Sequence, residues 1–291
     1  MSPDRLRPHR GQPRLRLLHL DAGIGSSALL LLAAQGAIPG FDYAVFPDPG
    51  WYPAAVYTHV RRLKRIAADA GIRLIHTPAG HPTAAHHCRA PALPLHSRDA
   101  DGTLARLPNG CARSRPRAVE SEAERLLGNL AADATPEGAD AECAVGLGVD
   151  HAAHATRSEA ERLRFTYPLL DIGWTRRDCR AFLFLRGLAD VFDPLCIACP
   201  NRSDSSWAEL KATDPAAWEQ AVAVDAAIRH GYAAAAARGM PSGSTYYLHH
   251  DRVPLAEADL DADTGPDPDQ GSPWACRDDQ ADNGTRGGDA T

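Results

Sequence analysis

The sequence lacks any apolar run long enough to cross a lipid bilayer. Its longest apolar stretch, Ala28–Ala34, is far shorter than the roughly 20 residues that a membrane helix needs. The first ten residues contain no apolar core of a signal peptide, and the chain shows no internal repeat. These absences argue against a membrane protein, an exported protein and a repeat architecture, so the expected compartment is the cytoplasm.

A strong overall charge is also missing. The formal net charge is −6, but ten acidic residues follow Ala256, against only Arg277 and Arg286. Without this acidic tail, the rest of the chain has a charge near +2. The charge balance therefore excludes neither a nucleotide nor a nucleic-acid partner.

The N-terminal third of the chain alternates apolar segments of strand and helix length. Strands are predicted over 15–20, 41–46 and 72–76, with helical segments over 28–34 and 54–70 between them. Strand–helix–strand–helix–strand within 65 residues is typical of an open, mostly parallel α/β sheet with helices on both faces. This is the fold class that we expect.

The remaining segments complete a prediction of the domains. Residues 77–110 show no period and are expected to form a long loop. A strand is predicted over 144–149, and helices over 117–130, 176–185, 205–211 and 215–230. The predicted domains are a disordered leader (1–13), a nucleotide-binding α/β domain (14–155), a helical cysteine-bearing region packed on it (156–261), and a disordered acidic tail (262–291).

A turn of small residues joins the first strand to the first helix. Free backbone N–H groups and hydroxyls at a helix N-terminus favour an anion such as phosphate. The residues expected to bind it are Gly23, Ile24, Gly25, Ser26 and Ser27. Asp21 at the start of the turn suits a phosphate only if it faces away or helps to hold magnesium. A plain glycine-requiring β–α turn is the alternative interpretation.

A second turn, Pro47-Asp48-Pro49-Gly50-Trp51, follows the second strand. Ligands of open sheets bind at the carboxyl ends of strands. Asp48 is therefore a candidate ligand for a ribose hydroxyl or magnesium, and Trp51 a candidate platform for a base. The alternative is a rigid turn with a tryptophan in the core.

The chain contains seven cysteines, which a reducing compartment would keep free, catalytic or metal-bound. Cys196 and Cys199 are spaced Cys-x-x-Cys, and Cys179 precedes them by 17 residues. Cys111, in a polar loop, is the best fourth ligand for zinc or for an iron–sulfur cluster. Cys143 is expected in the core. Unrelated buried thiols are the alternative.

These stretches resemble the PP-loop superfamily of adenine-nucleotide α-hydrolases, in particular the branch close to phosphoadenosine phosphosulfate (PAPS) reductase. The similarity extends from about residue 15 to residue 260. It is carried by Leu20-Asp-Ala-Gly-Ile-Gly-Ser-Ser, by Asp48-Pro-Gly-Trp, by Gly-Trp174-Thr-Arg-Arg-Asp-Cys179 and by Cys196-Ile-Ala-Cys199-Pro-Asn-Arg-Ser.

The resemblance implies an adenine-nucleotide-α-hydrolase-type sheet that binds ATP with magnesium, or an adenylylsulfate, at its carboxyl edge. Ser26 and Asp48 are the catalytic candidates, and Gly23, Ile24, Gly25, Ser27, Gly50 and Trp51 complete the nucleotide site. Cys111, Cys179, Cys196 and Cys199 are the positions that match ligands of a 4Fe–4S cluster, with zinc as the alternative.

The chain also departs from the family pattern. Only Gly23 and Ser26 are kept from the usual Ser-Gly-Gly-x-Asp-Ser loop, while Asp21 replaces its first serine and Gly25 its acidic residue. His151 and His154 stand where glutamate and arginine are usual. The cysteine-bearing end is thus closer to the family than the nucleotide-binding end.

The leading hypothesis is a PP-loop enzyme of sulfur metabolism, acting in ATP-dependent activation or sulfur transfer. One alternative is a sulfonucleotide reductase that uses Cys276 in the tail. The other is a non-catalytic nucleotide-binding subunit stabilised by zinc or a cluster. The sulfur donor or acceptor, a nucleic-acid partner and homo-oligomerisation remain open.

Overall fold

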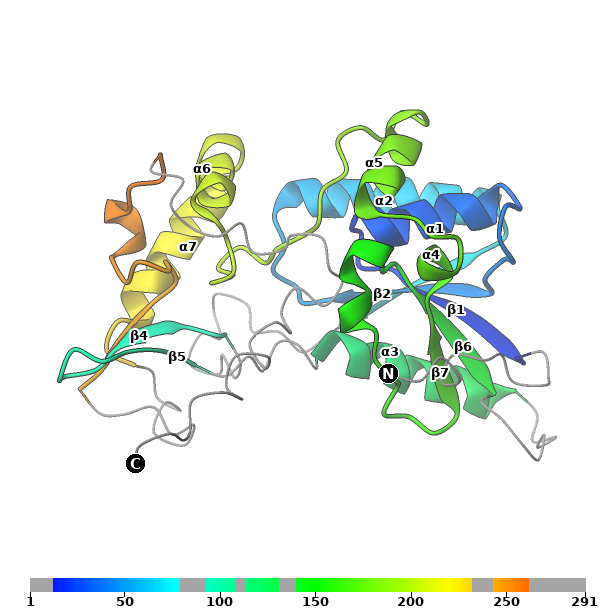
Figure 1. Cartoon of the computed structure of the whole chain (residues 1–291), viewed down its shortest axis with the longest axis horizontal. Coiled ribbons are helices and arrows are strands. Elements are labelled where there is room, and N and C mark those ends of the chain that lie inside the picture. The colour runs from blue at the N-terminus through cyan, green and yellow to red at the C-terminus, as the bar shows by residue number, and fades with distance from the viewer. Residues whose placement is uncertain (1–12, 79–92, 108–113, 131–139, 232–242, 262–291) are drawn as a thin grey trace, which may run out of the picture. The chain divides into compact units, whose positions relative to one another are not determined.

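The computed structural model describes residues 13–78, 93–107, 114–130, 140–231 and 243–261, and Figure 1 shows the arrangement of its elements. The strands are β1 (Leu15–His19), β2 (Tyr43–Asp48), β3 (Arg73–Pro78), β4 (His96–Arg98), β5 (Leu104–Arg106), β6 (Ala141–Val145), β7 (Leu163–Thr166) and β8 (Thr245–Tyr247). The helices are α1 (Ile24–Ala34), α2 (Ala54–Asp69), α3 (Ser114–Asn129), α4 (Pro168–Asp171), α5 (Arg176–Phe184), α6 (Asp204–Thr213) and α7 (Pro215–Ile228), with 3-10 turns η4 (Val149–His154) and η6 (Leu255–Glu257).

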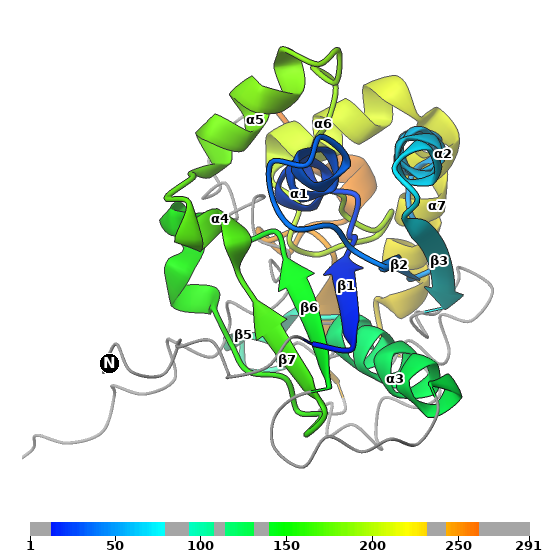
Figure 2. The ribbon, with the colours of Figure 1, turned by 90° about the vertical axis from the view of Figure 1, so that its right-hand side faces the viewer.

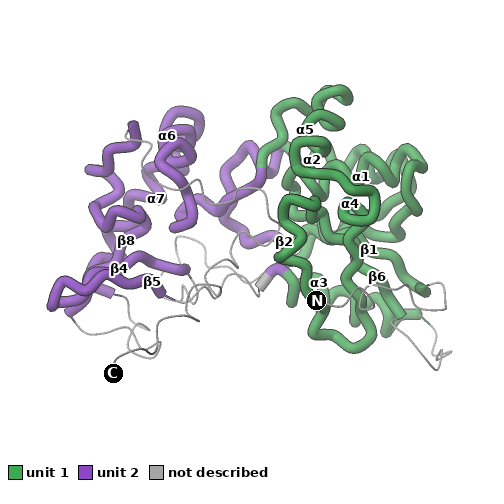
Figure 3. Tube along the Cα trace, viewed as in Figure 1, with its two compact units in different colours: residues 1–47, 59–77, 116–192 green, residues 48–58, 78–115, 193–291 purple. Residues whose placement is uncertain are grey.

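The chain forms two compact units, coloured separately in Figure 3. Unit 1 comprises Met1–Pro47, His59–Thr77 and Pro116–Phe192, and unit 2 comprises Asp48–Thr58, Pro78–Arg115 and Asp193–Thr291. The units are discontinuous in sequence, unlike the contiguous domains 14–155 and 156–261 of the prediction. Helix α5, which carries Cys179, belongs to unit 1.

Unit 1 is built on a five-stranded parallel sheet in the order β3-β2-β1-β6-β7. Figure 2 shows α1 and α2 over one face and α3 over the other. Strands covered on both faces are near-continuously apolar, and Leu15, Leu17 and Leu18 of β1 are all buried. This confirms the predicted α/β class.

Helix α1 is apolar around its whole circumference, which is typical of a buried helix. It packs on β1, α4 and α5. It ends at Ala34, and Gly36, just after the C-cap, has a left-handed φ of +70°. The Ala37 N–H closes the helix end by donating to the Leu32 carbonyl at 2.9 Å. The buried strand β1 and the buried helix α1 are therefore separated only by the short loop of residues 20–23.

Unit 2 contains a three-stranded antiparallel sheet in the order β5-β4-β8, together with α6 and α7. The prediction of a long loop over 77–110 is therefore wrong for 96–98 and 104–106. These strands have three residues each, and β5 is fully exposed, so neither produces an apolar alternation. Moreover, β8 joins β4 from almost 150 residues further along the chain, a pairing that local sequence does not encode.

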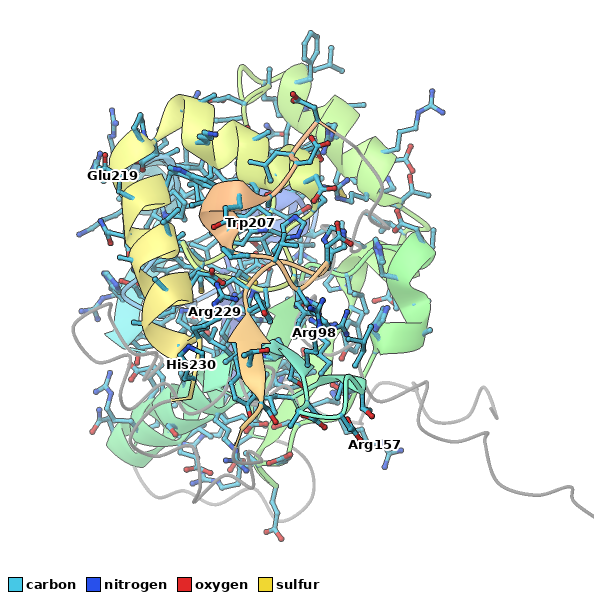
Figure 4. The ribbon with its side chains drawn as sticks, turned by 90° about the vertical axis from the view of Figure 1, so that its left-hand side faces the viewer. Arg98, Arg157, Trp207, Glu219, Arg229 and His230 are labelled. Atoms are coloured by element: carbon cyan, nitrogen blue, oxygen red, sulfur yellow. The ribbon has the colours of Figure 1, made fainter. Side chains whose placement is uncertain are left out.

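The core of unit 2 gathers aromatic and aliphatic side chains from distant segments. Trp207 of α6 is fully buried there and is labelled in Figure 4. Trp51, Leu95, Ile197 and Leu248 belong to the same cluster. At the end of α7, the Arg229 guanidinium lies 3.9 Å from the centre of the Tyr247 ring and donates to the Tyr246 carbonyl at 3.1 Å. These contacts fix α7 against β8.

Within the described ranges, no helix combines the length and the apolar character needed to cross a membrane. The predicted leader, apart from its last residue, and the predicted disordered tail (262–291) lie outside the described residues.

Candidate functional site

The strand order of unit 1 indicates where a ligand would bind. From β1 the chain builds β2 and β3 on one side, then crosses to β6 and β7 on the other. Open α/β sheets bind ligands beyond the carboxyl ends of their strands at such a reversal of strand order. The two loops at this position are 20–23, after β1, and 146–148, after β6.

Asp21 dominates the hydrogen bonding of the first loop. Its carboxylate Oδ1 accepts the Ser26 hydroxyl at 2.5 Å and the Gly23 N–H at 2.9 Å, and the side chain is buried. Two of the donors that the sequence assigned to a phosphate are therefore bound to a carboxylate of the chain itself. The loop has the donors of an anion site and carries its own anion.

Ala22 gives the loop its shape. Its φ of +65° lies in the left-handed region, which is uncommon for a residue with a side chain. The turn directs the Gly23 N–H back to Asp21, and α1 begins at the next residue. Gly23 is the N-cap of α1, and no side chain caps it.

The two loops meet at a pair of glycines. A Cβ on Gly25 would lie 2.0 Å from the Gly146 carbonyl oxygen, and a Cβ on Gly146 would lie 2.3 Å from the Ser26 nitrogen. Neither position accepts a side chain without a shift of backbone. The unusual Gly25 of the sequence is thus explained by close approach of α1 to the loop after β6.

The last of the small residues, Ser27, points into unit 1. Its Oγ lies 3.0 Å from His59 Nε2 of α2, and both residues are buried. Burial, assisted by the nearby Arg62 and opposed by Asp190, lowers the pKa of His59 to about 4. The imidazole is therefore neutral at physiological pH. Sequence reasoning missed His59, because a single histidine in an amphipathic helix gives no distinguishing signal.

The loop after β6 is fixed by α5. Asp150 Oδ2 accepts the Arg176 N–H at 2.8 Å at the start of that helix, and the Val149 N–H donates to the Trp174 carbonyl at 2.9 Å. His151 is buried, with Nδ1 3.4 Å from Asp150 Oδ1. The histidine that replaces the usual glutamate is thus packed beside this aspartate.

The turn after β2 belongs to unit 2. Asp48 Oδ1 accepts the Gly50 N–H at 2.7 Å and the Tyr57 hydroxyl at 3.0 Å. Burial and the adjoining Asp48 carboxylate raise the pKa of Tyr57 to about 12. Trp51 lies in the core of unit 2, and its Nε1–H donates to Gln220 at 3.4 Å. Trp51 is thus a core residue, and the roles of Asp48, Gly50 and Trp51 in nucleotide binding stay predictions.

The cysteine pair lies on two consecutive turns of unit 2. The Cys199 N–H donates to the Cys196 carbonyl at 3.2 Å, and the Arg202 N–H donates to the Cys199 carbonyl at 3.2 Å. Both cysteines are buried. Cys179 is buried in unit 1, and Cys111 and Cys276 lie outside the described residues. The four-cysteine ligand set therefore stays a prediction, whereas Cys143 is buried on β6 as expected.

A buried arginine adjoins the cysteine turn. The Arg202 guanidinium donates to the carbonyls of Cys196 (3.1 Å) and Leu195 (3.2 Å), and to Ser206 Oγ (2.8 Å). Burial lowers the pKa of Arg202, and the charges of Cys199 and Cys196 act in the opposite direction.

A second group of polar side chains in unit 2 was missed at the level of sequence. Asp204, at the start of α6, lies against His249 and His250, which follow β8. The signal that was available is the run Leu248-His-His-Asp251, whose adjacent histidines and acid are common metal ligands. Its aspartate partner comes from a segment 45 residues away.

Two sequence comparisons with known proteins give no relatives of this chain. No protein-family model matches the chain, and a search of curated proteins finds no significant similarity. The resemblance to the PAPS reductase branch therefore stays a prediction based on the motifs.

Proposed function

We propose that the chain is a PP-loop protein of the PAPS reductase-like branch that binds ATP or an adenylylsulfate at the carboxyl ends of β1 and β6. The observation that supports the proposal is the position of residues 20–27, which form the loop after β1 and the first turn of helix α1. They lie at the reversal of strand order in a parallel sheet. A fold of the adenine-nucleotide-α-hydrolase type accounts for this strand order and loop position together.

In this proposal, the loop donors act on the phosphates. The Ser26 hydroxyl and the backbone N–H groups at the start of α1 hold the phosphates and stabilise charge that develops on the leaving pyrophosphate. Because Asp21 already accepts from Ser26 and Gly23, its carboxylate has to give up these donors when a phosphate binds. Nucleotide binding is therefore in competition with Asp21.

The proposal includes a 4Fe–4S cluster held by Cys111, Cys179, Cys196 and Cys199. Cys196 and Cys199 stand at the two ends of one turn, in the Cys-x-x-Cys spacing that is common among ligands of iron–sulfur clusters. Such a cluster supplies redox chemistry or an iron atom that binds sulfur. ATP-dependent activation or sulfur transfer is the reaction class that combines it with a nucleotide site.

The first test is anaerobic purification of the full chain, with iron and zinc analysis, a visible spectrum and an assay of pyrophosphate release from ATP. We expect thiolate-to-iron absorbance, and pyrophosphate release that Ser26→Ala abolishes. Ser205→Ala, an exposed serine of α6, is the matched control and should retain full activity. Colourless protein with one zinc ion would refute the cluster, and equal inactivity of parent and Ser26→Ala would refute ATP cleavage.

The second test concerns competition by Asp21. Asp21→Ser removes the internal anion and should raise the affinity for ATP about tenfold, or 1.4 kcal/mol. The control for net charge is Asp42→Ser, which changes an exposed aspartate just before β2. Because this residue is at the amino end of the strand, away from the carboxyl ends that form the proposed site, affinity should change little. A fall in affinity for magnesium-ATP in Asp21→Ser would instead make Asp21 a magnesium ligand.

One specific observation supports a second candidate function. Because Asp21 fills the loop, the chain also fits a non-catalytic subunit whose cysteines bind zinc or a cluster for stability. In that case Asp21→Ser would bind ATP without releasing pyrophosphate. The measurement of release alongside binding separates the two functions.

A further inference from the structure

Three side chains of unit 2 bring metal-binding atoms together away from the cysteine turn. Asp204, His249 and His250 each offer one atom, and these atoms lie within 4.8 Å of one another. Asp204 is 1% exposed and His249 is fully buried, while the side chain of His250 is 23% exposed. Two of the three residues are thus buried, and solvent reaches the group through the side chain of His250.

The Asp204 carboxylate is only half satisfied. Its Oδ1 accepts from His249 Nε2 at 2.8 Å, but its Oδ2 is buried without a hydrogen-bond partner among the residues that the structure describes. A buried carboxylate oxygen without a partner is costly. The N-terminus of α6 favours the negative charge, but none of its described N–H groups donates to Oδ2. A cation bound by this carboxylate offsets part of this cost.

We propose that Asp204, His249 and His250 form a binding site for a divalent transition-metal ion of the zinc type. Ligands about 2.1 Å from zinc lie roughly 3.4 Å apart in a tetrahedron. Asp204 Oδ1 lies 2.8 Å from His249 Nε2 and 3.7 Å from His250 Nδ1, on either side of this separation. Small side-chain adjustments therefore reach the required geometry.

Asp251 lies near the ring nitrogens of both histidines that would face away from a bound metal ion. Its carboxylate Oδ1 lies 3.4 Å from His250 Nε2, the ring nitrogen on the far side from Asp204. Nε2 makes no hydrogen bond with the described residues, and a small shift of Asp251 would give it the carboxylate partner that fixes the tautomer of a metal-bound histidine. Its Oδ2 lies 4.0 Å from His249 Nδ1. The Asp251 backbone N–H donates to His249 Nδ1 at 3.3 Å, so the proton of the neutral ring is on Nε2, which donates it to Asp204. When a metal ion binds at Nε2, this proton has to move to Nδ1, where the Asp251 carboxylate replaces the backbone N–H as its partner.

The neighbouring basic residue does not compete for Asp204. The Arg252 guanidinium donates to the carbonyls of Ser97 (2.9 Å), His250 (2.9 Å) and Ala105 (3.2 Å). These hydrogen bonds join the segment that carries the histidines to β4, through Ser97, and to β5, through Ala105. Two imidazole nitrogens and one carboxylate oxygen are typical ligands of zinc, whereas magnesium and calcium prefer sites made of oxygen ligands alone. The bound ion would tie the segment after β8 to the start of α6.

The experiment titrates zinc into the chelator-treated full-length chain, with stoichiometry and affinity measured by competition against a chromophoric chelator. We expect His250→Ala and Asp204→Asn each to lose one zinc equivalent, or to weaken it by about 100-fold or more. His230→Ala, an exposed histidine at the end of α7 labelled in Figure 4, is the control and should bind as the parent does. Identical stoichiometry and affinity in the parent and both variants would overturn the proposal.

Cobalt spectra separate this site from the cysteine turn. Cobalt at Asp204, His249 and His250 has only nitrogen and oxygen ligands, so the band lost in His250→Ala should carry no thiolate-to-cobalt charge transfer. Loss of a thiolate band instead would assign the ion to Cys196 and Cys199 and refute the proposal. Because His250 is partly exposed, His250→Ala keeps the test valid if Asp204→Asn does not fold.

Discussion

Ala22 shows at the scale of one residue how the loop after β1 is held in a costly conformation. A residue with a side chain loses roughly 1 kcal/mol in the left-handed region relative to glycine. We therefore expect Ala22→Gly to raise the free energy of unfolding by about 1 kcal/mol, measured as a higher urea midpoint with an unchanged slope.

The control for Ala22→Gly is the same exchange in regular structure. Ala33→Gly lies in helix α1, where glycine costs about 1 kcal/mol, so its midpoint should fall. A lower midpoint in Ala22→Gly as well would mean that φ at this residue is not left-handed in solution.

His59 makes stability depend on pH. Its pKa is about 4 in the folded chain and about 6.5 when unfolded, so the unfolded state binds more protons between these values. The contribution of neutral His59 to the free energy of unfolding is fully present above pH 6.5. It is lost as the pH falls towards 4, and the loss reaches up to about 3 kcal/mol. Denaturant unfolding between pH 7.5 and 4.5 measures this loss.

The matched variant for this pH effect is His59→Gln, which keeps an amide group near Ser27 but does not titrate in this range. Its stability should fall less steeply below pH 6.5 than that of the parent. His96, whose pKa burial and the nearby Arg106 lower to about 3, remains in both proteins and affects both alike. Parallel curves for parent and variant would show that His59 is not the titrating group.

At the scale of elements, the contact of α1 with the loop after β6 depends on two glycines. Gly25→Ala places a Cβ 2.0 Å from the Gly146 oxygen, so strand β6 and helix α1 would have to separate. Overpacking of this kind costs roughly 1–3 kcal/mol or more. We expect a lower urea midpoint and weaker ATP binding, because the displaced helix carries Ser26.

Gly128 in α3 provides the opposite case. It is exposed within the helix, and a Cβ there meets no atom within 4 Å. Gly128→Ala should therefore raise stability by about 0.5–1 kcal/mol through helix propensity alone. If both alanine variants had the same sign, the steric account of Gly25 would fail.

Sequence predicted those elements that have their own apolar pattern. All four predicted strands of unit 1 exist, and α2 (Ala54–Asp69) agrees within one residue, because amphipathic period and the glycine at 71 define it locally. Strand β6 begins three residues earlier than predicted, at Ala141. The short strands β4, β5, β7 and β8 were missed because their formation depends on pairing with strands elsewhere in the chain.

At the scale of the whole molecule, the sequence predicted the positions of loops better than it predicted which side chains interact. It identified the turn at 21–27 and the turn at 196–199 from small residues and cysteine spacing. It did not reveal that Asp21 binds Ser26 or that Asp204 meets His249, because each pair is joined by folding. Spacing along a chain indicates which side chains are available, and the tertiary structure decides which of them are already engaged.

The two proposed ligands should act on different units, since every residue proposed for the loop donors is in unit 1 and every residue of the zinc site is in unit 2. A ligand at 100 times its Kd stabilises the state it binds by about 2.7 kcal/mol. In amide hydrogen exchange, ATP should slow exchange in 20–27 and 146–150, and zinc in 204–207 and 248–251. Apo protein and the Asp204→Asn variant with zinc are the controls. If zinc slowed exchange only around 196–202, the ion would be at the cysteines; if ATP slowed none of the loops of unit 1, the nucleotide site would be excluded there.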